Sequence, residues 1–327
     1  MPRIAIVTES PAESPHARFP SSAAGVIRGL LAQVGIEHQD VRFHSVLKTG
    51  QLSDILVSSK ELAIGGYPPP ERGKYFPASH AGDLGALFNN LRLQQPNVII
   101  AMGASALWAL TKNTGIAKWR GTPCLSPDGN WKVIPTWAAG SVTKQWELRP
   151  IVFMDMAKAL RHADSPTLSR PVSYIHVEPS LKDIEEFYNR YIVPAPFVAS
   201  DIETKNSTIT EISFAVSPKR ALVIPFWSRK HGNYWPTAEA ERAAWEWVRR
   251  ILAEKPTIGQ NFQYDMQYLW RTMGIPIPKF AGDTMLLHHS LQPEMKKGLG
   301  FLASVYTDRP QWKDMRADAE TLKREDD

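Results

Sequence analysis

The stretch "PFVASDIETKNSTITEISFAV", residues 196–216, indicates the fold of the second half of the chain. Its apolar start predicts a buried strand, which leads into Asp201-Ile202-Glu203. Because side chains alternate across a strand, Asp201 and Glu203 project from one face while Ile202 points into the core. Two carboxylates held this close repel each other unless a cation neutralises them, and oxygen ligands suit divalent metals. A bare acid pair is more often a solvated strand end, so a second element has to decide between these interpretations.

That second element is "IGQNFQYDMQYL", residues 258–269. Asn261 and Asp265 are four residues apart, and residues at this spacing share one face of a helix. Two acids on a strand and an aspartate on a helix can hold two metal ions about 4 Å apart. Such a pair of ions stabilises the attacking and the leaving oxygen when a phosphodiester is hydrolysed. The combined pattern therefore favours a two-metal nuclease site.

The surrounding sequence predicts an α/β protein with two domains. In the first half, apolar strands alternate with amphipathic helices, which is typical of a parallel sheet covered on both faces. A polar segment with two prolines, residues 164–171, is a plausible linker. The second half combines neighbouring antiparallel strands with long helices and predicts a mixed sheet. The predicted strands are 3–9, 97–103, 131–137, 172–177, 198–216 in part, 221–227 and 257–261, and the predicted helices are 22–35, 83–96, 104–115, 149–163, 180–192, 238–255 and 262–274; residues 44–82 predict no clear element.

Composition limits the possible functions without choosing among them. The 327 residues suffice for two domains with cores of their own. No apolar run approaches the length of a membrane span, so no membrane association is expected. The single cysteine, Cys124, excludes a disulfide framework and a cysteine-only zinc or iron–sulfur site, and it fits a cytoplasmic location. The net charge of +5 permits nucleic acid as a partner.

Three motifs in the second half resemble the DnaQ-like 3′–5′ proofreading exonuclease domain of family A DNA polymerases. "DIET" is similar to the first exonuclease motif, "NFQYD" to the second, and residues 282–314 to the stretch that follows the second motif in phage and bacterial members. The resemblance covers residues 172–327 and implies a ribonuclease H-like fold. It implies that Asp201, Glu203 and Asp265 bind two Mg²⁺ or Mn²⁺ ions. It places Thr204 and Asn261 near the terminal nucleotide of a single-stranded DNA 3′ end.

The same family has a third motif, Tyr-x-x-x-Asp, on a later helix. By the family's spacing this motif should begin near Glu325, which stands where the tyrosine is expected, and its aspartate should fall just past residue 327; Asp326 and Asp327 are poor substitutes. We therefore expect the exonuclease domain to be incomplete at its C-terminal end, either as a fragment of a longer polymerase or as a domain that lacks one ligand. A polymerase domain or subunit is the implied partner. The neighbouring His288 and His289 are expected to lie in a packed helix rather than to bind metal.

Residues 1–163 resemble the uracil-DNA glycosylase superfamily, whose members have a three-layer α/β/α fold. The resemblance depends on the order of strands, turns and helices in "IVTESPAESPHARFPSSAAGVIRGLL", "PNVIIAMGASALWALT" and "WKVIPTW". It implies that Glu9 handles the attacking water and that Phe19 stacks on a flipped uracil. The sequence departs from the family at Ala138-Ala139-Gly140, where a histidine normally stabilises the leaving anion.

These observations favour a two-metal 3′–5′ exonuclease of DNA replication or repair with a glycosylase-like DNA-binding domain. Two alternatives stay open at this stage. The chain could be a uracil-DNA glycosylase that uses Glu9 and Phe19, or a DNA-binding scaffold in which both sites are inactive.

Overall fold

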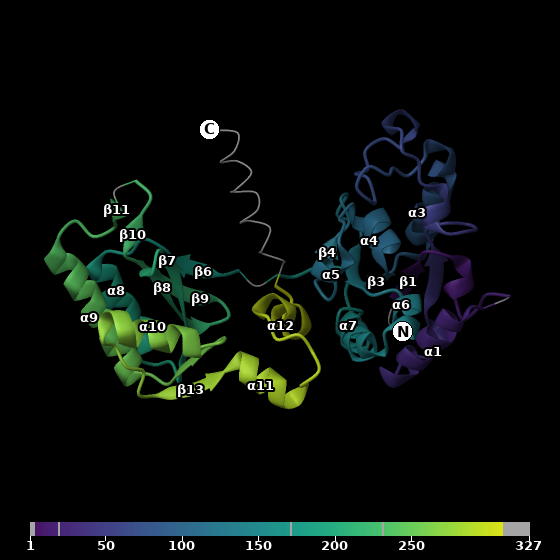
Figure 1. Cartoon of the computed structure of the whole chain (residues 1–327). Helices are drawn as coiled ribbons and strands as arrows, with labels where there is room; N and C mark the ends of the chain where they lie inside the picture. Colours follow the sequence, from purple (N-terminus) through teal and green to yellow (C-terminus); the bar gives the residue numbers. More distant parts are fainter. Residues whose placement is uncertain (1–3, 19, 171, 231, 310–327) are drawn as a thin grey trace. The chain divides into compact units, whose positions relative to one another are not determined.

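The chain forms two compact units (Figure 1). The structure, a computed structural model, describes residues 4–18, 20–170, 172–230 and 232–309. Of the described residues, the first unit comprises 4–18, 20–170 and 300–309, and the second comprises 172–230 and 232–299. The division after residue 170 falls in the segment that the sequence suggests as a linker, whereas residues 300–309 group with the first unit.

The first unit is built on a sheet of five strands in the order β2-β1-β3-β5-β4. Strands β1, β2, β3 and β5 run parallel, and the short β4 pairs antiparallel with β5. The strands are β1 (Ile4–Thr8), β2 (Arg42–Ser45), β3 (Val98–Met102), β4 (Cys124–Leu125) and β5 (Lys132–Thr136); the helices are α1 (Ser22–Gln33), α2 (Leu52–Ile55), α3 (Ala81–Gln94), α4 (Ala104–Thr111), α5 (Ile116–Trp119), α6 (Ala139–Lys144), α7 (Arg149–Arg161) and α12 (Leu299–Tyr306).

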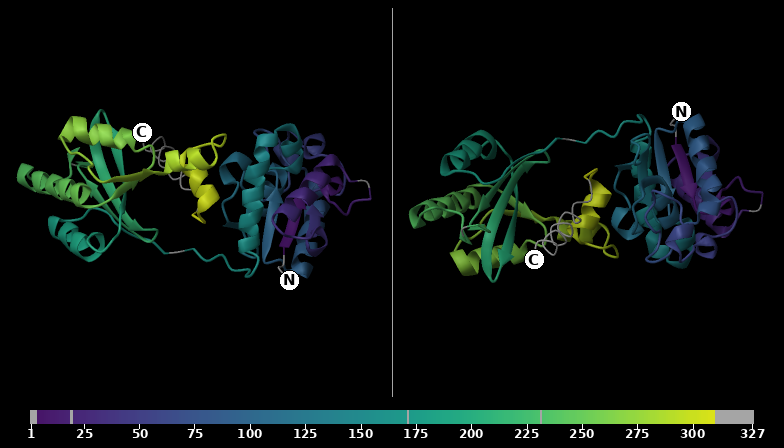
Figure 2. Two further views of the ribbon diagram at one scale, coloured as in Figure 1. Left: turned by 90° about the horizontal axis from the view of Figure 1, so that it is seen from below. Right: turned by 90° about the horizontal axis from the view of Figure 1, so that it is seen from above.

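Helices cover both faces of this sheet, as both views in Figure 2 show. On one face, Ile4, Ile6 and Ile100 pack against α1, α6 and α7. On the other face, Val7 and Ile99 pack against α3 and α4. All residues of β1, β3 and β5 are buried, and the apolar runs of β1 and β3 follow from that burial on both faces. The predicted three-layer α/β/α architecture is confirmed.

Strand β2 lies in a region where the sequence predicts no element. Its residues are exposed or half-buried, as is usual for an edge strand, and its sequence lacks a regular alternation of apolar and polar side chains. Parallel pairing with β1, from Ala5 opposite Arg42 to Thr8 opposite Ser45, fixes its position. Backbone pairing of this kind leaves little trace in the sequence.

The second unit contains a mixed six-stranded sheet in the order β13-β12-β7-β8-β9-β6. Strand β8 runs antiparallel to both β7 and β9, whereas the β7–β12, β12–β13 and β9–β6 pairs are parallel. The strands are β6 (Tyr174–His176), β7 (Val198–Lys205), β8 (Thr208–Ser217), β9 (Arg220–Pro225), β10 (Trp227–Ser228), β11 (Gly232–Asn233), β12 (Thr257–Gly259) and β13 (Phe280–Asp283); the helices are α8 (Leu181–Phe187) with a π-helical extension (Tyr188–Ile192), α9 (Ala238–Glu254), α10 (Gln263–Met273) and α11 (Thr284–Leu291). The α/β class and the mixed sheet are as predicted.

One hydrophobic core holds the second unit together. Val198, Ile202, Ile212 and Leu222 on the sheet pack against buried residues of α8, α9 and α10. Helix α8 starts at Ser180, whose hydroxyl accepts the Asp183 N–H while the Asp183 carboxylate accepts the Ser180 N–H. This capping box fixes the helix start that the sequence predicts at Ser180.

Helix α12 packs inside the first unit through buried charges. The Arg120 guanidinium pairs with the Asp155 carboxylate and donates to the Ser304 hydroxyl at 2.9 Å. The Lys158 ammonium donates to the carbonyls of Ser304 and Thr307. A lysine at carbonyls of this kind satisfies the free acceptors at the end of a helix. These contacts anchor α12 in the first unit, although its sequence neighbours belong to the second.

Over the described ranges, none of the helices combines the length and the apolar character that crossing a membrane requires.

Candidate active site

Strand β7 presents two of the predicted ligands. Ile202 is 6% exposed and lies in the core of the second unit. Asp201 is exposed and Glu203 half-buried on the opposite face, as the alternation predicts. Across the ladder, Glu203 pairs with Glu211 of β8. Like charges directly opposite each other repel, and a bound cation would offset that repulsion.

Helix α10 brings the third predicted ligand to the same strand. Asp265 lies in the first turn of α10 and is 3% exposed. Its Oδ1 accepts the backbone N–H of Ile202, between the two acids of β7, at 2.8 Å. This hydrogen bond joins the two sequence motifs.

The electrostatics of Asp265 are those of a buried carboxyl group close to other carboxylates. Burial, together with the nearby carboxylates of Asp201 and Asp283, raises the pKa of Asp265 from 3.8 to about 6, while the hydrogen bond from Ile202 opposes the rise. A divalent cation at this position would favour the ionised form.

Thr204 and Tyr264 form a polar contact beside the acids. Their hydroxyl oxygens lie 2.9 Å apart. The Tyr264 ring is 45% exposed and lies 4.9 Å from that of Tyr268, measured between ring centroids. Tyr264 therefore adds an accessible aromatic ring to the predicted site, where bases of a single strand could stack.

Asn261 occupies a strained backbone position that Asp283 stabilises. It has φ +54°, in the left-handed region. Its N–H donates to Asp283 Oδ1 at 3.0 Å, and the N–H of Phe262 donates to Asp283 Oδ2 at 2.7 Å. The same carboxylate caps α11 by accepting the Met285 N–H at 2.8 Å. Asp283 thereby fixes the turn that leads into α10, while the side chain of Asn261 is exposed.

Asp283 is a positioning residue that the sequence analysis does not identify. The available signal is weak, because an aspartate before a helix is read as an ordinary N-cap. The two histidines of α11 are placed as expected in a helix, His288 buried and His289 exposed.

The donor set fits a hard divalent cation in its chemistry, since Asp201, Glu203 and Asp265 offer only carboxylate oxygens. The side chains do not converge fully, however. Among the residues that the structure describes, no three His, Cys, Asp or Glu side chains form a group that could hold a metal ion. The third predicted motif, expected to begin near residue 325, lies outside the described residues.

The predicted glycosylase-like residues are only partly placed. Glu9 follows β1, accepts the Leu52 N–H at 3.1 Å and also accepts a hydrogen bond from the Ser105 hydroxyl. It lines a cavity of about 720 Å³, together with Gly103 and Ala138. Phe19 lies outside the described residues.

Comparisons with known proteins found one matching family model and several similar solved structures. Residues 179–323 match a family model described as 3'-5' exonuclease. No curated protein matches the chain. Similar solved structures include the EXD2 exonuclease domain soaked in Mn and GMP, with 14% identity and a TM-score of 0.29 over 42% of this chain and 70% of that chain. The same domain soaked in Mg matches with 12% identity and a TM-score of 0.28, over 46% and 83%. The Aedes aegypti Nibbler EXO domain matches with 10% identity and a TM-score of 0.28, over 40% and 63%.

Likenesses with TM-scores this low do not define the fold, which follows from the strand order β13-β12-β7-β8-β9 of the second unit itself. The family match begins at residue 179, so the glycosylase resemblance of the first unit stays a prediction. Residues 179–323 are thus similar to 3′–5′ exonuclease domains.

Proposed function

We propose that the chain removes nucleotides from the 3′ end of a DNA strand with Asp201, Glu203 and Asp265 as the catalytic carboxylates. The observation that carries this proposal is the hydrogen bond from the Ile202 N–H to Asp265. It places the acid of the second motif against the backbone between the two acids of the first. The family match over residues 179–323 supports the same reaction.

The proposed cofactor is a pair of Mg²⁺ or Mn²⁺ ions, held by Asp201, Glu203 and Asp265. When bound, such ions neutralise the charge that develops on the phosphodiester and lower the pKa of a bound water. The chain itself contributes position. Asp283 fixes the turn before α10, and the bond to Ile202 orients the Asp265 carboxylate.

The terminal nucleotide is assigned to the surface formed by Thr204, Asn261 and Tyr264 next to the acids. Thr204 and Asn261 would contact its polar groups, and the exposed ring of Tyr264 would stack on a base. Single-stranded DNA is the proposed substrate, because stacking needs unpaired bases. A family A DNA polymerase domain or subunit is the proposed partner, and the cytoplasm the proposed location.

The test uses single-stranded DNA carrying a 5′ label, incubated with the purified chain and Mn²⁺. We expect stepwise shortening from the 3′ end that a chelator stops and that Asp201→Ala reduces at least about a hundredfold, because the loss of positioning costs most of such a site's catalysis. Glu239→Ala, at an exposed position of α9, is the matched control. Intact DNA with the unmodified chain, at any metal concentration, would refute the proposal.

A second candidate function is base excision by the first unit. It is favoured by the position of Glu9 in the cavity of about 720 Å³, at the carboxyl ends of β1 and β3. Open α/β sheets bind ligands at this edge. Abasic sites in uracil-containing DNA, lost with Glu9→Gln but not with Asp201→Ala, would support it. DNA binding without either product would instead indicate a non-catalytic scaffold.

A further inference from the structure

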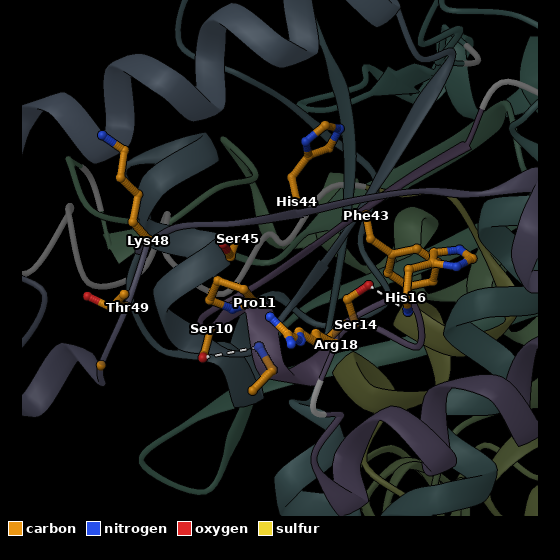
Figure 3. A pocket seen from close by; sticks show the side chains of 13 residues that line it. Ser10, Pro11, Ser14, His16, Arg18, Phe43, His44, Ser45, Lys48 and Thr49 are labelled. Carbon is orange, nitrogen blue, oxygen red and sulfur yellow. Dashed lines mark hydrogen bonds between the residues drawn. The ribbon is translucent and has the colours of Figure 1, made fainter.

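A second cavity of the first unit lies beyond the carboxyl ends of β1 and β2 (Figure 3). It has a volume of about 580 Å³, within the usual range for small-molecule sites. Its walls are the loop after β1, residues 10–18, and the segment 43–50 that includes the end of β2. The cavity shares Ser10, Ala12 and Gly50 with the cavity around Glu9, so the two adjoin.

The lining of this cavity is positively charged. Its lining residues include Arg18 and Lys48 but no aspartate or glutamate. Lys48 makes a long ion pair of 3.7 Å with Asp83 from outside the cavity, and 66% of the Lys48 side chain stays exposed. An exposed pair of this kind is weak, so the lysine can serve a second anion. Burial lowers the pKa of His44, which leaves Arg18 and Lys48 to carry the charge at neutral pH.

Hydroxyl groups and rings complete the lining. Ser10 and Ser14 use their oxygens to accept backbone N–H groups, so their O–H groups can still donate. In Figure 3 the rings of His16 and Phe43 lie on one side, Lys48 and Thr49 on the other, and Arg18 between them. The centroids of the two rings are 5.2 Å apart. One side of the cavity is thus aromatic and the other cationic.

We propose that this cavity binds the phosphate group of a nucleotide, either a free nucleotide or one unit of a nucleic-acid strand. Arginine presents a planar fork of donors that matches phosphate oxygens, and lysine adds a point charge. Serine hydroxyls bind the remaining oxygens, and the His16–Phe43 wall accepts a base or sugar. This site is separate from the carboxylates of the second unit and needs no metal.

The experiment is titration calorimetry of the full chain in the presence of a chelator, which prevents metal-dependent cleavage. The probes are inorganic phosphate, thymidine monophosphate and a single-stranded oligodeoxynucleotide. The test variant is the double substitution Arg18→Gln and Lys48→Gln. Its charge-matched control is Lys60→Gln with Arg92→Gln, at exposed positions of the same unit away from the cavity.

We expect the test variant to bind the mononucleotide at least about tenfold more weakly than the control does, since each removed group is a charged hydrogen-bond donor. If a strand is the natural ligand, the salt dependence of oligonucleotide binding should also fall by about 0.7 in its logarithmic slope, because one phosphate contact is lost. If a free nucleotide is the natural ligand, the mononucleotide should bind more tightly than the oligonucleotide. Equal affinities of the test and control variants for all three probes would overturn the proposal.

Discussion

The buried carboxyl of Asp265 predicts that the candidate active site lowers the stability of the second unit. Asp265→Asn keeps the shape of the side chain and an oxygen that can accept the Ile202 N–H. It removes the charge that burial, Asp201 and Asp283 disfavour. We therefore expect the variant to be more stable than the natural chain when divalent metal is removed.

The magnitude follows from the pKa of Asp265, which burial raises from 3.8 to about 6. Each pH unit corresponds to about 1.36 kcal/mol, which gives an upper bound of about 3 kcal/mol. Between these two values the folded chain binds more protons at Asp265 than the unfolded chain does. The free energy of unfolding therefore falls as the pH rises through this window, and the loss persists above it. The gain from Asp265→Asn should be close to zero near pH 4 and reach about 1–3 kcal/mol at pH 8.

Hydrogen exchange of the backbone amides of β7 and β8 is the suitable assay, because it reports on the second unit by itself. Samples contain a chelator and cover pH 5 to 8. Glu185→Gln, an exposed position on α8, controls for the loss of one negative charge. Adding Mn²⁺ should then stabilise the natural chain but not the variant, since a ligand stabilises only the state that binds it. A variant that is no more stable at pH 8, or a gain that does not depend on pH, would refute this reasoning.

Four further outcomes test other parts of the structure. Asp155→Ala leaves the buried Arg120 guanidinium without its paired carboxylate; urea denaturation should show a loss of about 3–5 kcal/mol, against about 1 kcal/mol or less for Asp83→Ala, which removes the long ion pair with Lys48 and the acceptor of the Lys48 backbone N–H. Gly121→Ala would place a Cβ 2.7 Å from the Ser304 carbonyl oxygen at φ +71°, so exchange of the α12 amides should accelerate while that of β8 stays unchanged. Asp283→Ala removes the acceptor of three backbone N–H groups and should lower the exonuclease rate at least about tenfold, with partial recovery in Asp283→Asn; equal rates in all three would contradict its positioning role. Cys124 is buried, and burial raises the pKa of its thiol to about 12, so a thiol reagent at pH 8 should react only after urea unfolds the first unit.

The strands of both sheets could be predicted where burial dictates the sequence. All five residues of β3 are buried and apolar. A run of this kind predicts a strand that is covered on both faces. The acid pair on β7 could be predicted for the complementary reason, since one face of that strand is buried and the alternation fixes which side chains leave it. Both inferences need only local sequence.

The role of Asp283 could not be predicted, because it depends on strand pairing between distant segments. Asp283 reaches Asn261 and Phe262 only since β13 pairs in parallel with β12, with Asp283 opposite Gly259. Gly259 itself allows the turn, because a Cβ there would lie 2.1 Å from the Phe262 ring. Locally, "GDTM" reads as a strand end and an N-cap, and nothing in those four letters identifies the second contact.

Helix α12 shows the same limit at the level of the domain. Its sequence, "LGFLASVY", is apolar enough to join the core of either unit. Its position is determined by Arg120, Asp155 and Lys158, which are buried in the first unit and satisfied by contacts to α12. Buried charges are costly without such partners, so the first unit depends on a segment that follows the second unit in the chain. A domain boundary drawn from the sequence pattern alone separates α12 from the buried charges that it contacts. The residues that bind α12 lie more than 140 positions before it in the chain.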